Sequence, residues 1–181
     1  SQGRRVFLMQ GNRDFMLGED FARHCGGTLL KTQAVIEVRG QRMLLSHGDE
    51  WCTLDNEYQA FRRQVRDPAF QTAGLEMTVE ERIAFAKEAR AKSVQTKSVK
   101  TAEMMDVVDE AVLADCRRWD ARIVIHGHTH KPAHHDCGTF ERFVLPDWNL
   151  HGEHGIKPRR GWIELDEAGR PKLVMRHGVF W

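Results

Sequence analysis

The chain has 181 residues, of which 41% are hydrophobic and 29% charged, and its formal net charge is +1 at pH 7. The length suits a single domain, and the near-neutral charge argues against a protein held on nucleic acid by bulk electrostatics. No apolar run approaches the roughly 18 residues of a membrane helix, and the first residues lack the apolar stretch of a signal peptide. We therefore expect a single domain over residues 1–181, in the cytoplasm and without a nucleic-acid partner.

Short elements are predicted along the first part of the chain. Residues 6–10 and 28–30 are expected as strands on either side of a short helix at 16–25, which a Gly-Gly pair ends. Residues 34–38 and 41–46 flank an Arg-Gly pair, and this pattern predicts a β-hairpin.

A helical region is predicted next. Residues 55–66 form one helix, because aromatic and aliphatic side chains recur there at spacings of three and four. A second helix is expected over 78–91, where a Thr-x-x-Glu capping box begins it. A connection this long is unusual between neighbouring elements. It predicts a helical cap, inserted at about residues 52–100 over a functional site.

The strongest helix prediction covers residues 101–120 and leads into a strand at 122–125. The apolar positions of this helix form one stripe, at Met104, Met105, Val108, Val112, Leu113 and Cys116. Residues 140–145, 161–165 and 172–176 are expected as strands of an antiparallel finishing sheet. Together these elements predict the α/β class.

Polar side chains follow three of the apolar runs at the point where each run ends. They lie in Gly11-Asn12-Arg13-Asp14, in His47-Gly48-Asp49 and in His126-Gly127-His128-Thr129-His130. Open α/β sheets place their sites at the carboxyl ends of strands. The three segments are therefore expected to meet at one point.

Three histidines within five residues at a strand end favour metal binding over a solvated polar loop. His126 is compatible with a contact to a ligand residue or to substrate. Asn12 offers a neutral oxygen that suits a hard divalent ion beside imidazoles, although Gly-Asn-Arg-Asp taken alone is more often a turn. Arg13 offers two donors to a phosphate oxygen, and Asp14 is placed to orient a neighbouring ligand.

These motifs resemble the calcineurin-like metallophosphoesterases, whose pattern includes Gly-Asn-His-Asp/Glu, a separate His and Gly-His-x-His. The resemblance is closer to the UDP-2,3-diacylglucosamine pyrophosphatases of lipid A synthesis, which have Arg in the first motif and a helical insertion. The segments that carry it, besides the three motifs, are Cys52-Thr53, Tyr58-Gln59-Ala60-Phe61-Arg62, Met105-Asp106-Val107 and Lys131-Pro132. The resemblance implies a calcineurin-like α/β sandwich with a helical cap.

The same resemblance implies a reaction and a set of site residues. Two Mn²⁺ ions would activate a water that hydrolyses the pyrophosphate to lipid X (2,3-diacylglucosamine 1-phosphate) and UMP. Asn12, His47 and His128 correspond to ligands of one ion and His130 to a ligand of the other, with Asn12, Arg13 and His128 as the catalytic set. The substrate contacts are Asn12, Arg13, Asp55, Tyr58, Arg90, Ser93, Lys97, Lys100 and His128. A lipid-linked nucleotide implies peripheral contact with the cytoplasmic face of the inner membrane.

The sequence departs from the family pattern at two places. Leu54 stands where the family usually has the first Asp of Cys-Thr-Asp-Asp, so only Asp55 is carried over. The Asp-x-His strand end and the Gly-Asp with the bridging carboxylate are not found ahead of Val6. We therefore expect an N-terminally truncated chain that holds one metal ion or none, has weak or absent activity, and self-associates through an exposed sheet edge.

Two other interpretations remain open. A metallophosphoesterase acting on a soluble nucleotide or phosphoprotein would share the metal motifs without needing an apolar cap. A non-catalytic fragment that binds a metal or a partner would keep the ligands without turnover.

Overall fold

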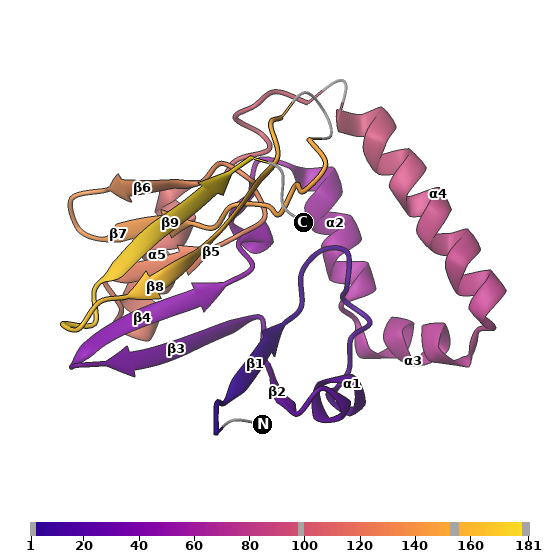
Figure 1. The fold of residues 1–181 in the computed structure, drawn as a ribbon. Helices are drawn as coiled ribbons and strands as arrows, with labels where there is room; N and C mark the ends of the chain where they lie inside the picture. Colours follow the sequence, from indigo (N-terminus) through magenta and orange to yellow (C-terminus); the bar gives the residue numbers. More distant parts are fainter. Residues whose placement is uncertain (1–2, 98–99, 153–155, 179–181) are drawn as a thin grey trace.

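The computed structural model describes residues 3–97, 100–152 and 156–178. At its centre is a five-stranded mixed sheet with the strand order β3-β4-β5-β7-β6 (Figure 1). These strands are β3 (Gln33–Val38), β4 (Gln41–Ser46), β5 (Ile123–His126), β6 (Ala133–Asp136) and β7 (Glu141–Val144). β5 is parallel to β4 and β7, while β3 and β6 are antiparallel to their neighbours. The register pairs Ser46 with His126, so β4 and β5 end side by side.

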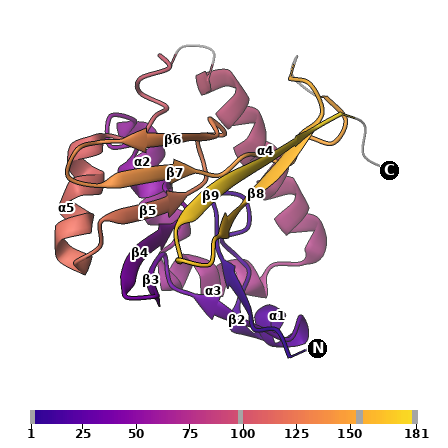
Figure 2. The same cartoon turned by 60° about the vertical axis from the view of Figure 1, so that its left-hand side comes forward.

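One layer covers each face of this sheet (Figure 2). Helix α5 (Asp109–Trp119) packs on one face, and the hairpin of β8 (Arg159–Leu165) and β9 (Pro171–His177) on the other. Alternation along β4 explains both contacts, since Leu44 belongs to the cluster with α5 and Met43 to the cluster with β8. Both side chains are fully buried, which fixes the strand register and hence the position of His47.

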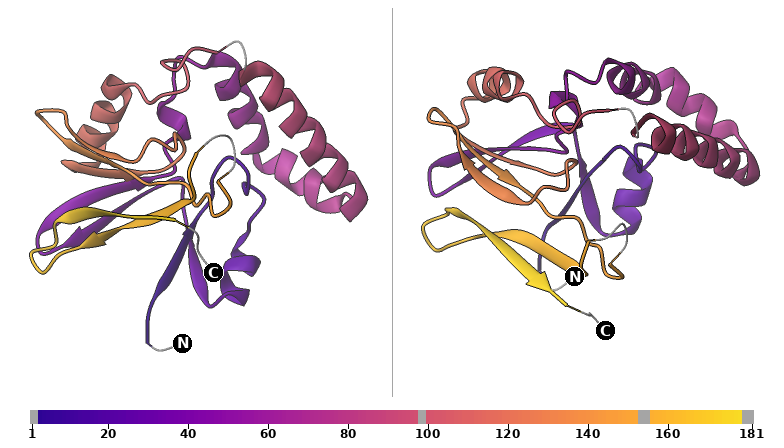
Figure 3. Two further views of the ribbon diagram at one scale, coloured as in Figure 1. Left: turned by 45° about the horizontal axis from the view of Figure 1, so that its top comes forward. Right: turned by 90° about the horizontal axis from the view of Figure 1, so that it is seen from above.

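Three helices follow β4 and project to one side of the sheet (Figure 3). They are α2 (Asn56–Val65), α3 (Pro68–Glu76) and α4 (Val79–Lys97). α2 lies nearest to the ends of β4 and β5, and α4 extends away from them (Figure 1). Among the described helices, none has the length and apolar character required to cross a membrane.

The N-terminal segment forms a separate, two-stranded parallel sheet. Its strands β1 (Val6–Met9) and β2 (Gly27–Leu30) are joined through helix α1 (Glu19–His24). The predicted strands and hairpin of the first part are thus confirmed, with a shorter helix than residues 16–25. Asn12 lies in the loop that follows β1. Its backbone N–H donates to the His47 ring, so this loop lies at the end of the central sheet.

The helix predicted over residues 101–120 is wrong in its first half, because α5 begins only at Asp109. Asp106 prevents an earlier start: its carboxylate accepts the Val107 N–H at 2.9 Å and pairs with Lys131 at 2.5 Å. The Val108 N–H donates to the Trp51 carbonyl, 2.9 Å away, in place of a helical partner. Local side-chain acceptors and one long-range bond therefore outweigh the apolar periodicity.

Three other element predictions need correction. The helix expected to end at residue 91 continues to Lys97, through residues with good helix propensity. α3 was not predicted. The Asp67 side chain caps it by accepting the Ala69 N–H at 2.8 Å, and Pro68 is its first residue. Finally, β7 belongs to the central sheet, where it runs parallel to β5, and only β8 and β9 form the separate antiparallel pair.

Candidate active site

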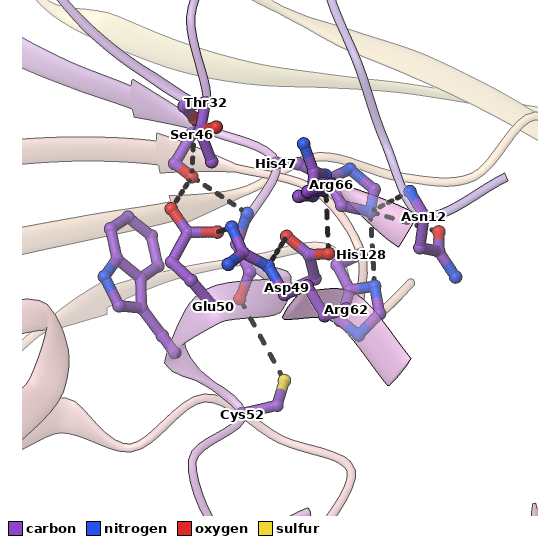
Figure 4. A network of polar contacts seen from close by, with 12 residues as sticks. Asn12, Thr32, Ser46, His47, Asp49, Glu50, Cys52, Arg62, Arg66 and His128 are labelled. Atoms are coloured by element: carbon purple, nitrogen blue, oxygen red, sulfur yellow. Dashed lines mark hydrogen bonds and ion pairs between the residues drawn. The ribbon is translucent and has the colours of Figure 1, made fainter. Parts of the chain in front are cut away.

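Three of the sequence-predicted ligands meet beyond the ends of β4 and β5 (Figure 4). The His47 Nε2 atom lies 3.1 Å from the Asn12 Oδ1 atom, 3.3 Å from the Asn12 backbone nitrogen and 3.2 Å from the His128 Nδ1 atom. The parallel register of β4 and β5 brings the two histidines together, and the loop after β1 supplies the asparagine. The prediction that these three segments meet is therefore confirmed.

The spacing of these donor atoms fits a metal ion. Nitrogen and oxygen ligands about 2.0–2.2 Å from one ion are separated from each other by roughly 3.0–3.4 Å, and the separations here are 3.1 and 3.2 Å. One ring nitrogen has a single proton or lone pair, so it cannot bond all of its three polar neighbours. Burial lowers the pKa of His47, which keeps its imidazole neutral, as a metal ligand must be.

No group of three His, Cys, Asp or Glu side chains with metal-binding geometry occurs in residues 3–97, 100–152 and 156–178. The triplet of Asn12, His47 and His128 contains two histidines, and the amide oxygen of Asn12 is its third donor. His130, the fourth ligand predicted from the sequence, has its Nδ1 atom 3.8 Å from the Asp147 carboxylate. Arg159 donates to the His130 carbonyl at 2.9 Å and to Asp147 at 2.7 Å.

The buried carboxylate of Asp49 is linked through Tyr58 to His128, one of the three candidate ligands. Asp49 has no solvent-exposed surface, accepts the Tyr58 hydroxyl at 2.6 Å, and lies 3.1 Å from Arg62 and 3.5 Å from Arg66. Burial alone would raise the pKa of Asp49, but the Tyr58 hydrogen bond and the two guanidinium groups hold it well below its usual range. The Tyr58 ring lies against His128, with centroids 5.5 Å apart. The Tyr58 ring, which is hydrogen-bonded to Asp49, therefore packs against the candidate ligand His128.

His126 is part of the core and does not line the site. Its imidazole is fully buried beside Trp51, its Nδ1 atom is 2.9 Å from the Gly127 carbonyl, and burial lowers its pKa to about 4. Gly48 has a φ of 98° and approaches this ring so closely that an added Cβ would lie 2.7 Å from Nδ1. A glycine is therefore required at the turn that follows His47.

The predicted substrate contacts lie along α2 and α4. The Asp55 carboxylate is buried, caps α2 by accepting the Tyr58 N–H at 3.0 Å, and binds the Lys100 ammonium at 2.7 and 2.8 Å. Arg13, Arg90 and Ser93 are solvent-exposed. Lys97 is the last residue of α4, and its side chain lies outside the described part of the structure.

Sequence reasoning missed the network around Asp49, because Arg62 and Arg66 look like the solvated face of a helix. The available signal was the spacing of Tyr58, Arg62 and Arg66, which lie four residues apart and so on one face of α2 and its C-cap.

Comparison with known proteins shows which family the chain belongs to. It is 43% identical over 168 residues to a UDP-2,3-diacylglucosamine hydrolase of Bordetella parapertussis, covering 91% of this chain and 64% of that protein. It is 42% identical over 181 residues to a UDP-2,3-diacylglucosamine hydrolase of Aromatoleum aromaticum, covering 98% of this chain and 70% of that protein. The chain belongs to the UDP-2,3-diacylglucosamine hydrolase family. No family model matches it.

This member of the UDP-2,3-diacylglucosamine hydrolase family spans 64% of the length of the Bordetella relative. An archaeal phosphodiesterase of known structure resembles it with a TM-score of 0.45 and 10% identity, over 94% of this chain and 68% of that one. The Asn12, His47 and His128 donor atoms are suited to hold a divalent metal ion.

Proposed function

We propose that the protein hydrolyses the pyrophosphate of UDP-2,3-diacylglucosamine, releasing UMP and 2,3-diacylglucosamine 1-phosphate. The observation that supports this most directly is the convergence of Asn12, His47 and His128 in a chain of this family. Residues 1–181 would form a single metallophosphoesterase domain, in which about residues 52–100 make a helical cap for the lipid half of the substrate.

The proposed metal is Mn²⁺, held by Asn12, His47 and His128, with His130 as a ligand of a second ion. A bound Mn²⁺ would act as a Lewis acid toward the phosphoryl group and lower the pKa of the attacking water. The chain's own residues would orient the substrate. Arg13 is solvent-exposed beside Asn12 and would bind a phosphate oxygen through two N–H groups.

The lipid half would lie along α2 and α4, where Asp55, Tyr58, Arg90, Ser93, Lys97 and Lys100 are the proposed contacts. The ion pair between Asp55 and Lys100 pre-orients both groups beside the start of α2. α3 and α4 also expose large apolar side chains, among them Leu75, Ile83 and Val94. These side chains suit acyl chains and peripheral contact with the inner membrane on its cytoplasmic face.

The decisive experiment measures UMP released from UDP-2,3-diacylglucosamine by this chain. We expect slow UMP release that requires added Mn²⁺ and stops when EDTA removes the metal. The reason is that Asn12, His47 and His128 provide ligands for one metal ion. Hydrolysis of a soluble nucleotide diester, with none of the lipid substrate, would contradict the proposal. Tight binding of Mn²⁺ without any UMP release would instead indicate a non-catalytic metal-binding protein.

We also propose self-association through β1. Among the described strands, β1 is hydrogen-bonded to β2 only, and its Val6 and Phe7 are 46% and 50% exposed. A strand with an open edge and apolar side chains invites pairing with another chain. Sedimentation velocity should show dimers that increase with protein concentration and decrease in Phe7→Lys, whereas a monomer at all concentrations would rule this out.

A further inference from the structure

A cavity of about 470 Å³ lies beside the loop that carries His128 and His130. Its walls come from Asp106, residues 129–133, β6, β7, Ile156 and the first residue of β8, and none of its lining residues belongs to α2 or α4. The size falls within the range of small-molecule sites, which is roughly 300–1,000 Å³. His130 forms part of its wall, which places the cavity next to the candidate metal ligands.

The wall combines an apolar surface with a few polar groups. Ala133, Val144 and Ile156 provide the apolar part. The Thr129 hydroxyl oxygen also belongs to a lining residue, is buried, and has no hydrogen-bond partner within the described residues. Because buried hydroxyl groups in proteins are normally hydrogen-bonded, this oxygen points to a ligand that completes its bonding.

The charges around the cavity are nearly balanced. Arg142 pairs with Asp109 at 3.4 Å and Arg159 with Asp147 at 2.5 Å, and both arginines are mostly buried. Lys131 pairs with Asp106 at 2.5 Å but keeps a side chain that is 51% exposed. The cavity therefore suits a largely neutral group with one anionic end at the rim beside Lys131, and its paired arginines make it poorly suited to a free polyanion.

We propose that this cavity binds the nucleotide half of the substrate, with the pyrimidine on the apolar wall and the phosphate toward His130 and Lys131. The inference rests on the proposed function. A pyrophosphate positioned at Asn12, His47 and His128 has two substituents, and the contacts proposed for the lipid half lie on the α2 and α4 side. The other substituent therefore needs a different surface, and the cavity offers one whose wall includes Thr129 and His130, the residues that follow His128 in the chain.

The test is a titration of the whole chain with UMP, followed by NMR of ¹³C-labelled methyl groups. We expect saturable shifts of the Ala133, Val144 and Ile156 methyl signals. Thr129→Val has the same shape but lacks the hydroxyl, so it should weaken UMP binding by about tenfold, as expected for one lost hydrogen bond. Thr28→Val is the matched control, because Thr28 is solvent-exposed in β2 and does not line the cavity, and it should bind UMP as the unmodified chain does.

The outcomes separate this inference from the proposed function. Equal UMP affinity in the unmodified chain and Thr129→Val, or UMP shifts confined to residues outside the cavity, would overturn the cavity assignment even if the chain releases UMP from the lipid substrate. Specific UMP shifts in the cavity, together with no lipid hydrolysis, would support a nucleotide site and contradict the proposed reaction. Circular dichroism of Thr129→Val shows whether the variant is folded.

Discussion

Replacing Asp49 with Ala should destabilise the protein by about 3–5 kcal/mol, the usual cost of removing one partner from a buried ion pair. The change would leave Arg62 and Arg66 largely buried without their shared carboxylate, and the Tyr58 hydroxyl without its acceptor. For a chain of this size, such a loss corresponds to a decrease in Tm of about 10 °C. Differential scanning calorimetry measures it directly.

Two variants make this result specific to the buried network. Asp20→Ala removes a carboxylate whose side chain is 93% exposed and paired only at the surface of α1, so its Tm should not change. Tyr58→Phe keeps the ring beside His128 and removes only the hydroxyl that Asp49 accepts, so a smaller loss is expected. An Asp49→Ala variant as stable as Asp20→Ala would show that the network contributes nothing to stability.

Replacing His128 with Ala should abolish metal-dependent UMP release and weaken Mn²⁺ binding by at least about 100-fold, because one of three converging donors is lost. Isothermal titration calorimetry gives the Mn²⁺ affinity independently of activity. The variant should remain folded, since His128 is only partly buried and lies in a loop.

His177→Ala is the matched control for this experiment, because His177 is solvent-exposed at the end of β9. It should bind Mn²⁺ with unchanged affinity. Unchanged Mn²⁺ binding in His128→Ala as well would exclude the Asn12, His47 and His128 triplet as the metal site.

The convergence of Asn12, His47 and His128 was predictable because it depends on strand ends. β4 and β5 have strong hydrophobic patterns, and parallel neighbours present their following residues at the same edge of a sheet. The hairpin of β3 and β4 was predictable for a similar reason: Arg39 and Gly40 both have positive φ values, of 53° and 77°, which suit its tight turn.

The elements that were missed depend on contacts that a local pattern does not contain. The first half of the helix expected at 101–120 is prevented by Trp51 and Lys131, which are distant in sequence. Likewise, β7 joins the central sheet because it pairs with β5 in parallel register, a choice that alternation along residues 140–145 cannot reveal. The role of Asp49 depends on three partners brought to it by the docking of α2.

The backbone conformation at His128 and His130 is unfavourable for residues that have a side chain. His128 and His130 have φ values of 67° and 56°, in the left-handed region that costs a non-glycine residue on the order of 1 kcal/mol or more. Glycine or asparagine would occupy both positions at lower conformational cost. A variant library screened only for thermal tolerance should therefore become enriched in glycine at these sites, and the most heat-resistant members would have lost their imidazoles.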